Sequence, residues 1–140
     1  MLELISKEFD LEKTDIRTFS PLTLAYIGDA VYEVVVRTVI VEQANRPVNQ
    51  LHKMVTEYVK APAQARMILE LKDLLTPKEG EVYKWGKNAK PYTTAKNASR
   101  SDYHKATGFE ALMGHLYLTG QQERMVELIR QGMERIKEQP

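Results

Sequence analysis

A chain of 140 residues with 43% hydrophobic and 28% charged residues has the length and composition of a globular protein with a buried core. It contains no cysteine, which excludes disulfides and thiolate metal sites. No apolar run approaches the roughly 18 residues of a membrane span, and the N-terminus lacks the basic start and apolar stretch of a signal peptide. We therefore expect a cytoplasmic protein with no membrane contact.

The first predicted helix begins at Ser20-Pro21, a good N-cap followed by proline at the first helical position. Its apolar residues continue through a β-branched run at 34–41 towards Ala44. That run lacks the alternation of a strand, so we interpret it as a buried helix. Pro47 closes this helix and opens the next. Pro62 breaks or kinks that second element before helical spacing resumes.

Later helices are predicted from their start and stop signals. Thr76-Pro77-Lys78-Glu79 combines an N-cap, a proline and a capping-box glutamate, which predicts a helix to about Gly86. Residues 87–101 lack apolar periodicity and are predicted to form a long exposed loop. Ser101 or Asp102 is the predicted cap of the next helix.

That helix ends at Gly120, and a last amphipathic helix follows from Gln121 to about Lys137. The sequence therefore predicts a single all-α domain over residues 1–140 with six or so helices.

Positive charge is concentrated in one part of the chain. Between Lys84 and Lys105 lie six basic residues and one acid, Asp102, a net charge of +5 against −4 for the rest. This favours a surface for a polyanion, and the alternative is a solvated loop whose lysines serve solubility. Within this segment we interpret Trp85 as a core residue and leave Tyr92 undecided.

Two apolar stretches each contain one carboxylate, Asp29 in LAYIGDAVYE (24–33) and Glu110 in GFEALMGHLYL (108–118). A carboxylate among apolar neighbours needs hydrogen bonds, a cation or a raised pKa. Gly28 beside Asp29, and Gly108 and Gly114 on either side of Glu110, leave room for close helix approach, so the two acids can meet and hold one divalent metal ion. A structural hydrogen-bonding role for each acid is the alternative.

These two stretches resemble the two acidic signatures of the ribonuclease III catalytic domain. The first resembles the pattern Leu-Glu-Phe-Leu-Gly-Asp-Ser/Ala, and the second resembles Asp-x-Phe-Glu-Ala-Leu-x-Gly-x-x-Tyr-Leu. Their order and separation also agree, and the resemblance covers about residues 20–120. It implies the helical bundle of the ribonuclease III endonuclease domain.

The chain departs from the family pattern at several acids, and only Asp29 and Glu110 match its metal-binding positions. The replaced acids correspond to Leu22, Ala25, Thr107 and a position within 48–50. The absence of these acids resembles the pattern of the mini-ribonuclease III branch. That branch lacks a separate double-stranded-RNA-binding domain. Further similarity to this branch lies in His52-Lys53, in the segment APAQA (61–65) and in the segment GKNAK (86–90). Since the chain ends at Pro140, we expect no RNA-binding domain after it.

The resemblance implies an endoribonuclease that cleaves double-stranded RNA as a homodimer. Asp29 and Glu110 would be its catalytic residues and its ligands for Mg²⁺, for which Mn²⁺ is a substitute. The implied substrate is the precursor of large-subunit (23S) ribosomal RNA, which places the protein in rRNA processing and ribosome biogenesis. A ribosomal protein is a further expected partner.

RNA binding would then fall to the catalytic domain itself, through contacts with phosphates and sugar hydroxyls. We expect these contacts to weaken steeply with salt. The expected RNA-binding residues are Lys87, Asn88, Lys90, Lys96, Asn97 and Arg100.

Several readings stay open. Glu33 either accepts a hydrogen bond beside Asp29 or is a surface acid, and Thr107 is a candidate to hydrogen-bond a metal-bound water. The three histidines lie at no metal-ligand spacing, which argues against zinc. The main rival function is a catalytically weak or inactive module of the same fold that binds double-stranded RNA in ribosome assembly. A helical interaction adaptor without a nucleic-acid role is a second rival.

Overall fold

The computed structural model describes residues 1–90 and 99–137, and within these residues it contains helices and no strand. The predicted all-α class is therefore confirmed. Two short 3₁₀ helices lie at Ile16–Thr18 and Lys72–Leu74. The α-helices are α1 (Leu2–Glu8), α2 (Pro21–Gln43), α3 (Val48–Val59), α4 (Ala61–Leu71), α5 (Pro77–Lys87), α6 (Arg100–Leu118) and α7 (Gln122–Lys137).

The helix starts follow from local chemistry. The Ser20 hydroxyl accepts a hydrogen bond from the Thr23 amide at 3.1 Å and caps α2. Thr76 and Glu79 form the complete capping box that was predicted for α5. Between α3 and α4, Lys60 is extended with ψ of 149°, so the predicted break is confirmed, although α4 already begins at Ala61 and has Pro62 in its first turn.

Two predictions about the basic segment are wrong. Ser99 caps α6 by accepting from the Asp102 amide at 3.0 Å, so neither Ser101 nor Asp102 is the cap. Trp85 is not a core residue, because 47% of its surface is exposed. Its neighbours Val82 and Tyr83 are buried instead, since they lie on the side of α5 that packs on α6.

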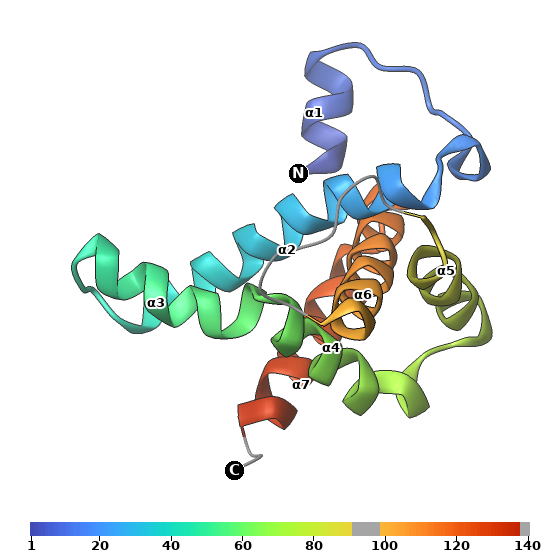
Figure 1. Ribbon diagram of the computed structural model, residues 1–140. Coiled ribbons are helices and arrows are strands. Elements are labelled where there is room, and N and C mark those ends of the chain that lie inside the picture. The colour runs from blue at the N-terminus through green and yellow to red at the C-terminus, as the bar shows by residue number, and fades with distance from the viewer. Residues whose placement is uncertain (91–98, 138–140) are drawn as a thin grey trace.

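Helix α6 is the centre of the fold, with α2, α4, α5 and α7 packed around it (Figure 1). Along α6, Phe109, Leu112, Met113 and Leu116 are fully buried. The β-branched run of α2 is helical as predicted, with Val36 and Ile40 buried. The C-terminal half of α2 extends to one side together with α3 (Figure 1). None of the described helices combines the length and the apolar character that a membrane crossing requires.

An ion pair ties α5 to α7. The Glu79 side chain is buried and accepts hydrogen bonds from Arg124 Nε and Nη2, both at 2.9 Å. Arg124 Nη2 also donates to the Leu74 carbonyl at 2.8 Å. The Arg124 guanidinium holds the pKa of Glu79 below its usual value, mainly through these hydrogen bonds. This pair fixes the start of α5 against the bundle.

Candidate active site

The site is built at a close crossing of α2 and α6, where two glycines let the backbones touch. A Cβ on Gly28 would overlap the main-chain oxygen of Glu110 and would lie 2.7 Å from the Gly114 nitrogen. A Cβ on Gly114 would likewise overlap the Leu24 carbonyl. Any side chain at either position would push the helices apart. The close approach predicted from Gly28 and Gly114 is therefore present, whereas Gly108 packs against Tyr83 of α5 and not against α2.

This crossing brings the carboxyl groups of Asp29 and Glu110 into contact. Asp29 follows Gly28 and lies at the surface, whereas Glu110 is partly buried. Burial, a hydrogen-bonding contact with Asp29 and the charge of Asp29 raise the pKa of Glu110 to about 9, while a hydrogen bond with Gln64 opposes this rise. In the metal-free protein the Glu110 carboxyl therefore holds a proton at neutral pH.

The surroundings of Glu110 come from α2 and α4. Tyr32 packs edge-on against Phe109, with ring centroids 5.1 Å apart, and its hydroxyl donates to the Tyr58 carbonyl at 2.7 Å. Burial and the Glu110 charge both raise the pKa of Tyr32. Gln64 of α4 is 2% exposed and reaches Glu110 with its side-chain amide.

Sequence reasoning gave Gln64 no role, although its position carried a signal. Gln64, Ile68 and Leu71 follow the spacing of one helix face, and all three are buried. A polar residue at such a position needs partners inside the fold. Its partners lie on other segments, so spacing alone could not name them.

Two further residues near the site act within their own helices. Glu33 pairs with Arg37 at 3.5 Å, which favours the surface-acid reading over a contact with Asp29. The Thr107 hydroxyl donates to the Tyr103 carbonyl at 3.0 Å, so its hydrogen is used in a hydrogen bond within α6. Ala25, at the position of a lost family acid, is buried.

The donor set fits a hydrated hard cation. Two carboxylates meet here, and within residues 1–90 and 99–137 no group of three or more His, Asp or Glu is placed to hold a metal ion. Oxygen ligands from one or two carboxylates suit Mg²⁺, which keeps several of its own waters. A cation would also replace the proton on the Glu110 carboxyl.

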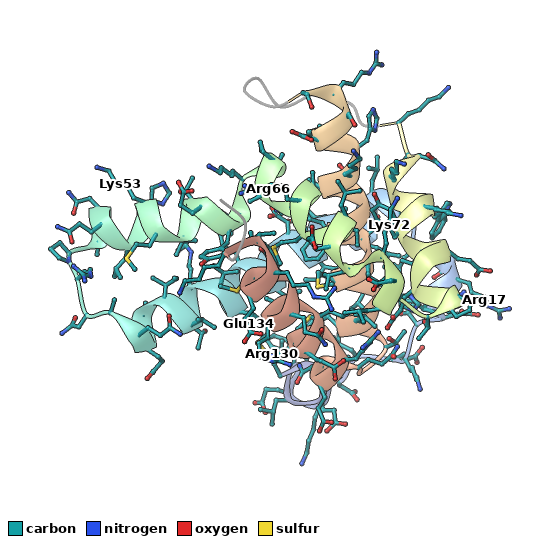
Figure 2. The ribbon with its side chains drawn as sticks, turned by 90° about the horizontal axis from the view of Figure 1, so that it is seen from below. Arg17, Lys53, Arg66, Lys72, Arg130 and Glu134 are labelled. Carbon is teal, nitrogen blue, oxygen red and sulfur yellow. The ribbon has the colours of Figure 1, made fainter. Side chains whose placement is uncertain are left out.

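The expected RNA-binding residues divide between described and undescribed parts of the chain. Lys87 ends α5, Asn88 caps it, and Lys90 is exposed beyond it. Arg100 opens α6 and is also exposed. Lys96 and Asn97, like Tyr92, lie outside the described residues. Exposed cations also occur elsewhere, including Lys53 on α3 and Arg66 on α4 (Figure 2).

Comparison with known proteins identifies the family. Residues 22–121 match the model of the ribonuclease III domain. The chain is 46% identical over 128 residues to the Mini-ribonuclease 3 of Thermoanaerobacter sp. strain X514, covering 91% of this chain and 90% of the relative. It is 47% identical over 117 residues to that of Enterococcus faecalis, covering 82% and 89%.

A solved structure agrees with this result. The crystal structure of protein FN1578 from Fusobacterium nucleatum superposes with a TM-score of 0.78 at 29% sequence identity. The match covers 86% of this chain and 97% of that protein. The family match spans both acidic stretches and the helices that carry them. The chain therefore belongs to the ribonuclease III domain family, in the branch of the mini-ribonucleases 3.

Proposed function

We propose that this protein is an endoribonuclease that hydrolyses double-stranded RNA with a divalent metal ion bound by Asp29 and Glu110. The observation that carries the proposal is the meeting of these two carboxyl groups at the Gly28–Gly114 crossing. Membership of the ribonuclease III family supports the reaction class. Mg²⁺ is the proposed ion and Mn²⁺ its substitute, because the donor set is hard oxygen.

The two acids have different tasks because their surroundings differ. Glu110 is held from behind by Gln64 and by the backbone contact with Gly28, so its position is fixed. Asp29 is exposed and presents its carboxylate where a phosphodiester can approach. Asp29 and Glu110 would hold the divalent cation, which would supply an activated water molecule and neutralise charge on the phosphate.

Duplex RNA is the proposed substrate, and the basic segment is its proposed binding surface. Lys87, Lys90 and Arg100 are placed to contact phosphates, and Asn88 to contact a sugar hydroxyl. We extend the same role to Lys96 and Asn97, which the structure does not describe. The proposed natural substrate is the large-subunit ribosomal RNA precursor, processed in the cytoplasm, and residues 1–140 are proposed to form one catalytic domain. A ribosomal protein is the proposed accessory partner.

A homodimer is proposed on the exposed face of α2. Tyr26 (81% exposed), Ala30 and Val34 (51% exposed) follow one another at four-residue spacing and carry little charge. This apolar stripe runs beside Asp29 on the same helix. A second copy packed there would place two carboxylate pairs in one particle, which suits cleavage of two strands.

One observation favours the alternative function. Among the described residues only two carboxylates meet at the site, which predicts weaker metal binding than a larger acidic cluster would give. A catalytically weak module that binds duplex RNA in ribosome assembly would keep the same fold. The two functions separate in a cleavage assay.

The test compares cleavage of a long RNA duplex by the wild-type protein and by Asp29→Asn and Glu110→Gln. We expect Mg²⁺-dependent products from the wild type and none after chelation. In each variant the cleavage rate should fall further than the about 10- to 100-fold that is typical when a hydrogen-bond partner of a metal ligand is removed. Glu33→Gln is the matched control, because Glu33 lies one turn from Asp29 and pairs with Arg37. A wild type without metal-dependent products would favour the binding module.

A further inference from the structure

Gln64 is held in one orientation by the break between α3 and α4. Helix α3 ends at Val59, so the Val59 carbonyl accepts no hydrogen bond from within its own helix. The Gln64 Nε2 donates to this carbonyl at 2.9 Å. If the Gln64 amide were rotated by half a turn, its Oε1 would face the Val59 carbonyl oxygen, so Nε2 stays on the Val59 side.

The same side chain also reaches the Glu110 carboxyl and lowers the pKa of that carboxyl. Nε2 has two hydrogens, so it can join the Val59 carbonyl and the Glu110 carboxylate. Gln64 therefore connects the last carbonyl of α3 to the site at the α2–α6 crossing. Helix α4 packs directly on α6, which keeps this connection short.

A glutamine at this buried position destabilises the fold. Its Oε1 atom is buried without a hydrogen-bond partner. An unsatisfied buried acceptor destabilises the fold, and an apolar side chain of similar size would avoid that penalty. Ile68 and Leu71, on the same face of α4, are apolar and fully buried. The polar group at position 64 is thus explained by what its nitrogen contacts.

We propose that Gln64 is a positioning residue that fixes the Glu110 carboxyl in the orientation needed to bind a divalent cation jointly with Asp29. The inference rests on the proposed function, since it concerns the same site. Partners that hold a metal ligand from outside typically change metal affinity or activity by about 10- to 100-fold when they are removed. An amide nitrogen that donates one hydrogen to the Val59 carbonyl and has a second hydrogen to donate to Glu110 suits this task.

The test uses Gln64→Met, which keeps the length of the side chain and removes its hydrogen bonds, and Gln64→Glu, which keeps its shape and oxygen but removes the donor. Mn²⁺ alone is titrated into each metal-free protein, and the free ion is measured by electron paramagnetic resonance. In parallel, duplex cleavage is measured against Mg²⁺ concentration. Tyr83→Phe is the control, because it removes the other buried unpartnered polar atom, on the α5 side of α6.

Gln64→Met should weaken Mn²⁺ binding and raise the Mg²⁺ concentration for half-maximal cleavage by about 10-fold or more. Its RNA affinity without metal should equal that of the wild type, and Tyr83→Phe should change neither metal measurement. Gln64→Glu should also weaken metal binding; tighter binding would show that an oxygen is wanted at position 64 and would overturn the donor role.

Failure of this inference is distinguishable from failure of the proposed function. If the wild type cleaves with metal and both Gln64 variants bind Mn²⁺ as the wild type does, Gln64 is only structural and the inference is overturned. If the wild type neither binds Mn²⁺ nor cleaves, both proposals fall. Circular dichroism of each variant shows whether it folds, and a folded Gln64→Glu decides the question where Gln64→Met does not fold.

Discussion

Gly28 of α2 lies directly on the backbone of α6, so close that its missing Cβ would be 2.7 Å from the nitrogen of Gly114. This contact sets the distance between the two helices. Asp29 follows Gly28, and Glu110 lies one turn before Gly114. The backbone contact therefore determines that the two carboxyl groups meet, and α4 supplies the side chain that holds Glu110 from behind.

Gly28→Ala is expected to separate α2 from α6. The added methyl group overlaps a carbonyl that cannot move alone, and such overpacking costs about 1–3 kcal/mol or more. The shift also separates the two acids, and a displacement of about 1 Å can reduce catalysis about 100-fold. Thermal unfolding and duplex cleavage check both effects.

Gly80→Ala is the matched control for that experiment. Gly80 lies inside α5 with nothing within 4 Å of an added Cβ. Because alanine favours helix over glycine, this variant should gain about 0.5–1 kcal/mol and keep its activity. Equal behaviour of the two variants would show that the α2–α6 contact is not what positions the site.

Much of the fold could be predicted because its helix ends carry their own chemistry. Ser20-Pro21 and the Thr76–Glu79 capping box specify helix starts locally, and both are found. The cap of α6 is different, since Ser99, Ser101 and Asp102 all have side chains suited to capping. The choice among them depends on how α6 packs, which no local pattern contains.

Features that depend on packing between segments could not be predicted. Trp85 is half-exposed because α5 touches the bundle along one narrow face, and sequence does not show how narrow that face is. The contact of Gln64 with Glu110 joins α4 to α6. Asp29 and Glu110 themselves were found through their apolar surroundings and glycine neighbours, and the resemblance to a family pattern named their role.

Removing positive charge from the basic segment should weaken RNA binding and its salt dependence. In the triple variant Lys87→Ala, Lys90→Ala and Arg100→Ala, each lost phosphate contact should reduce the slope of log affinity against log salt by about 0.7 to 0.9. Binding of a duplex at several salt concentrations measures this slope.

The control for charge alone removes three cations from α1 and α7, namely Lys7, Arg130 and Lys137. Arg130 pairs with Glu134 at 2.9 Å on α7 (Figure 2). This variant should keep the wild-type slope. If both triple variants change the slope equally, the basic segment has no special part in binding.

Loss of the Glu79 carboxylate should destabilise the protein in a pH-dependent way. Because Arg124 holds the pKa of Glu79 below its ordinary value, the pair contributes stability that is present above pH 4.5 and lost as pH falls through the lower folded-state value. Glu79→Gln should therefore cost about 1.5–3 kcal/mol at pH 7, and the difference from the wild type should shrink in acid.

Urea unfolding at several pH values measures that difference. Glu81→Gln is the control on the same helix, since Glu81 is exposed and lies 4.0 Å from Lys78. It should change stability by less than about 1 kcal/mol at any pH. If the loss of stability in Glu79→Gln stays the same at low pH, the lost charge is not its cause.

Val34→Lys should disrupt the proposed homodimer, because it places a charge in the apolar stripe of α2. Light scattering after size exclusion should show a monomer where the wild type shows a dimer. Val126→Lys on α7, where the valine is 46% exposed, should leave the dimer intact. A Val34→Lys variant that stays dimeric would place the subunit contact on another surface.

The most direct test of the central claim is anomalous X-ray scattering from crystals of the protein soaked with Mn²⁺. A single peak in contact with carboxylate oxygens of both Asp29 and Glu110 is the predicted result, and it should vanish in Asp29→Asn. A peak bound elsewhere, or the two acids joined by a shared proton with no ion at high Mn²⁺ concentration, would contradict the metal site.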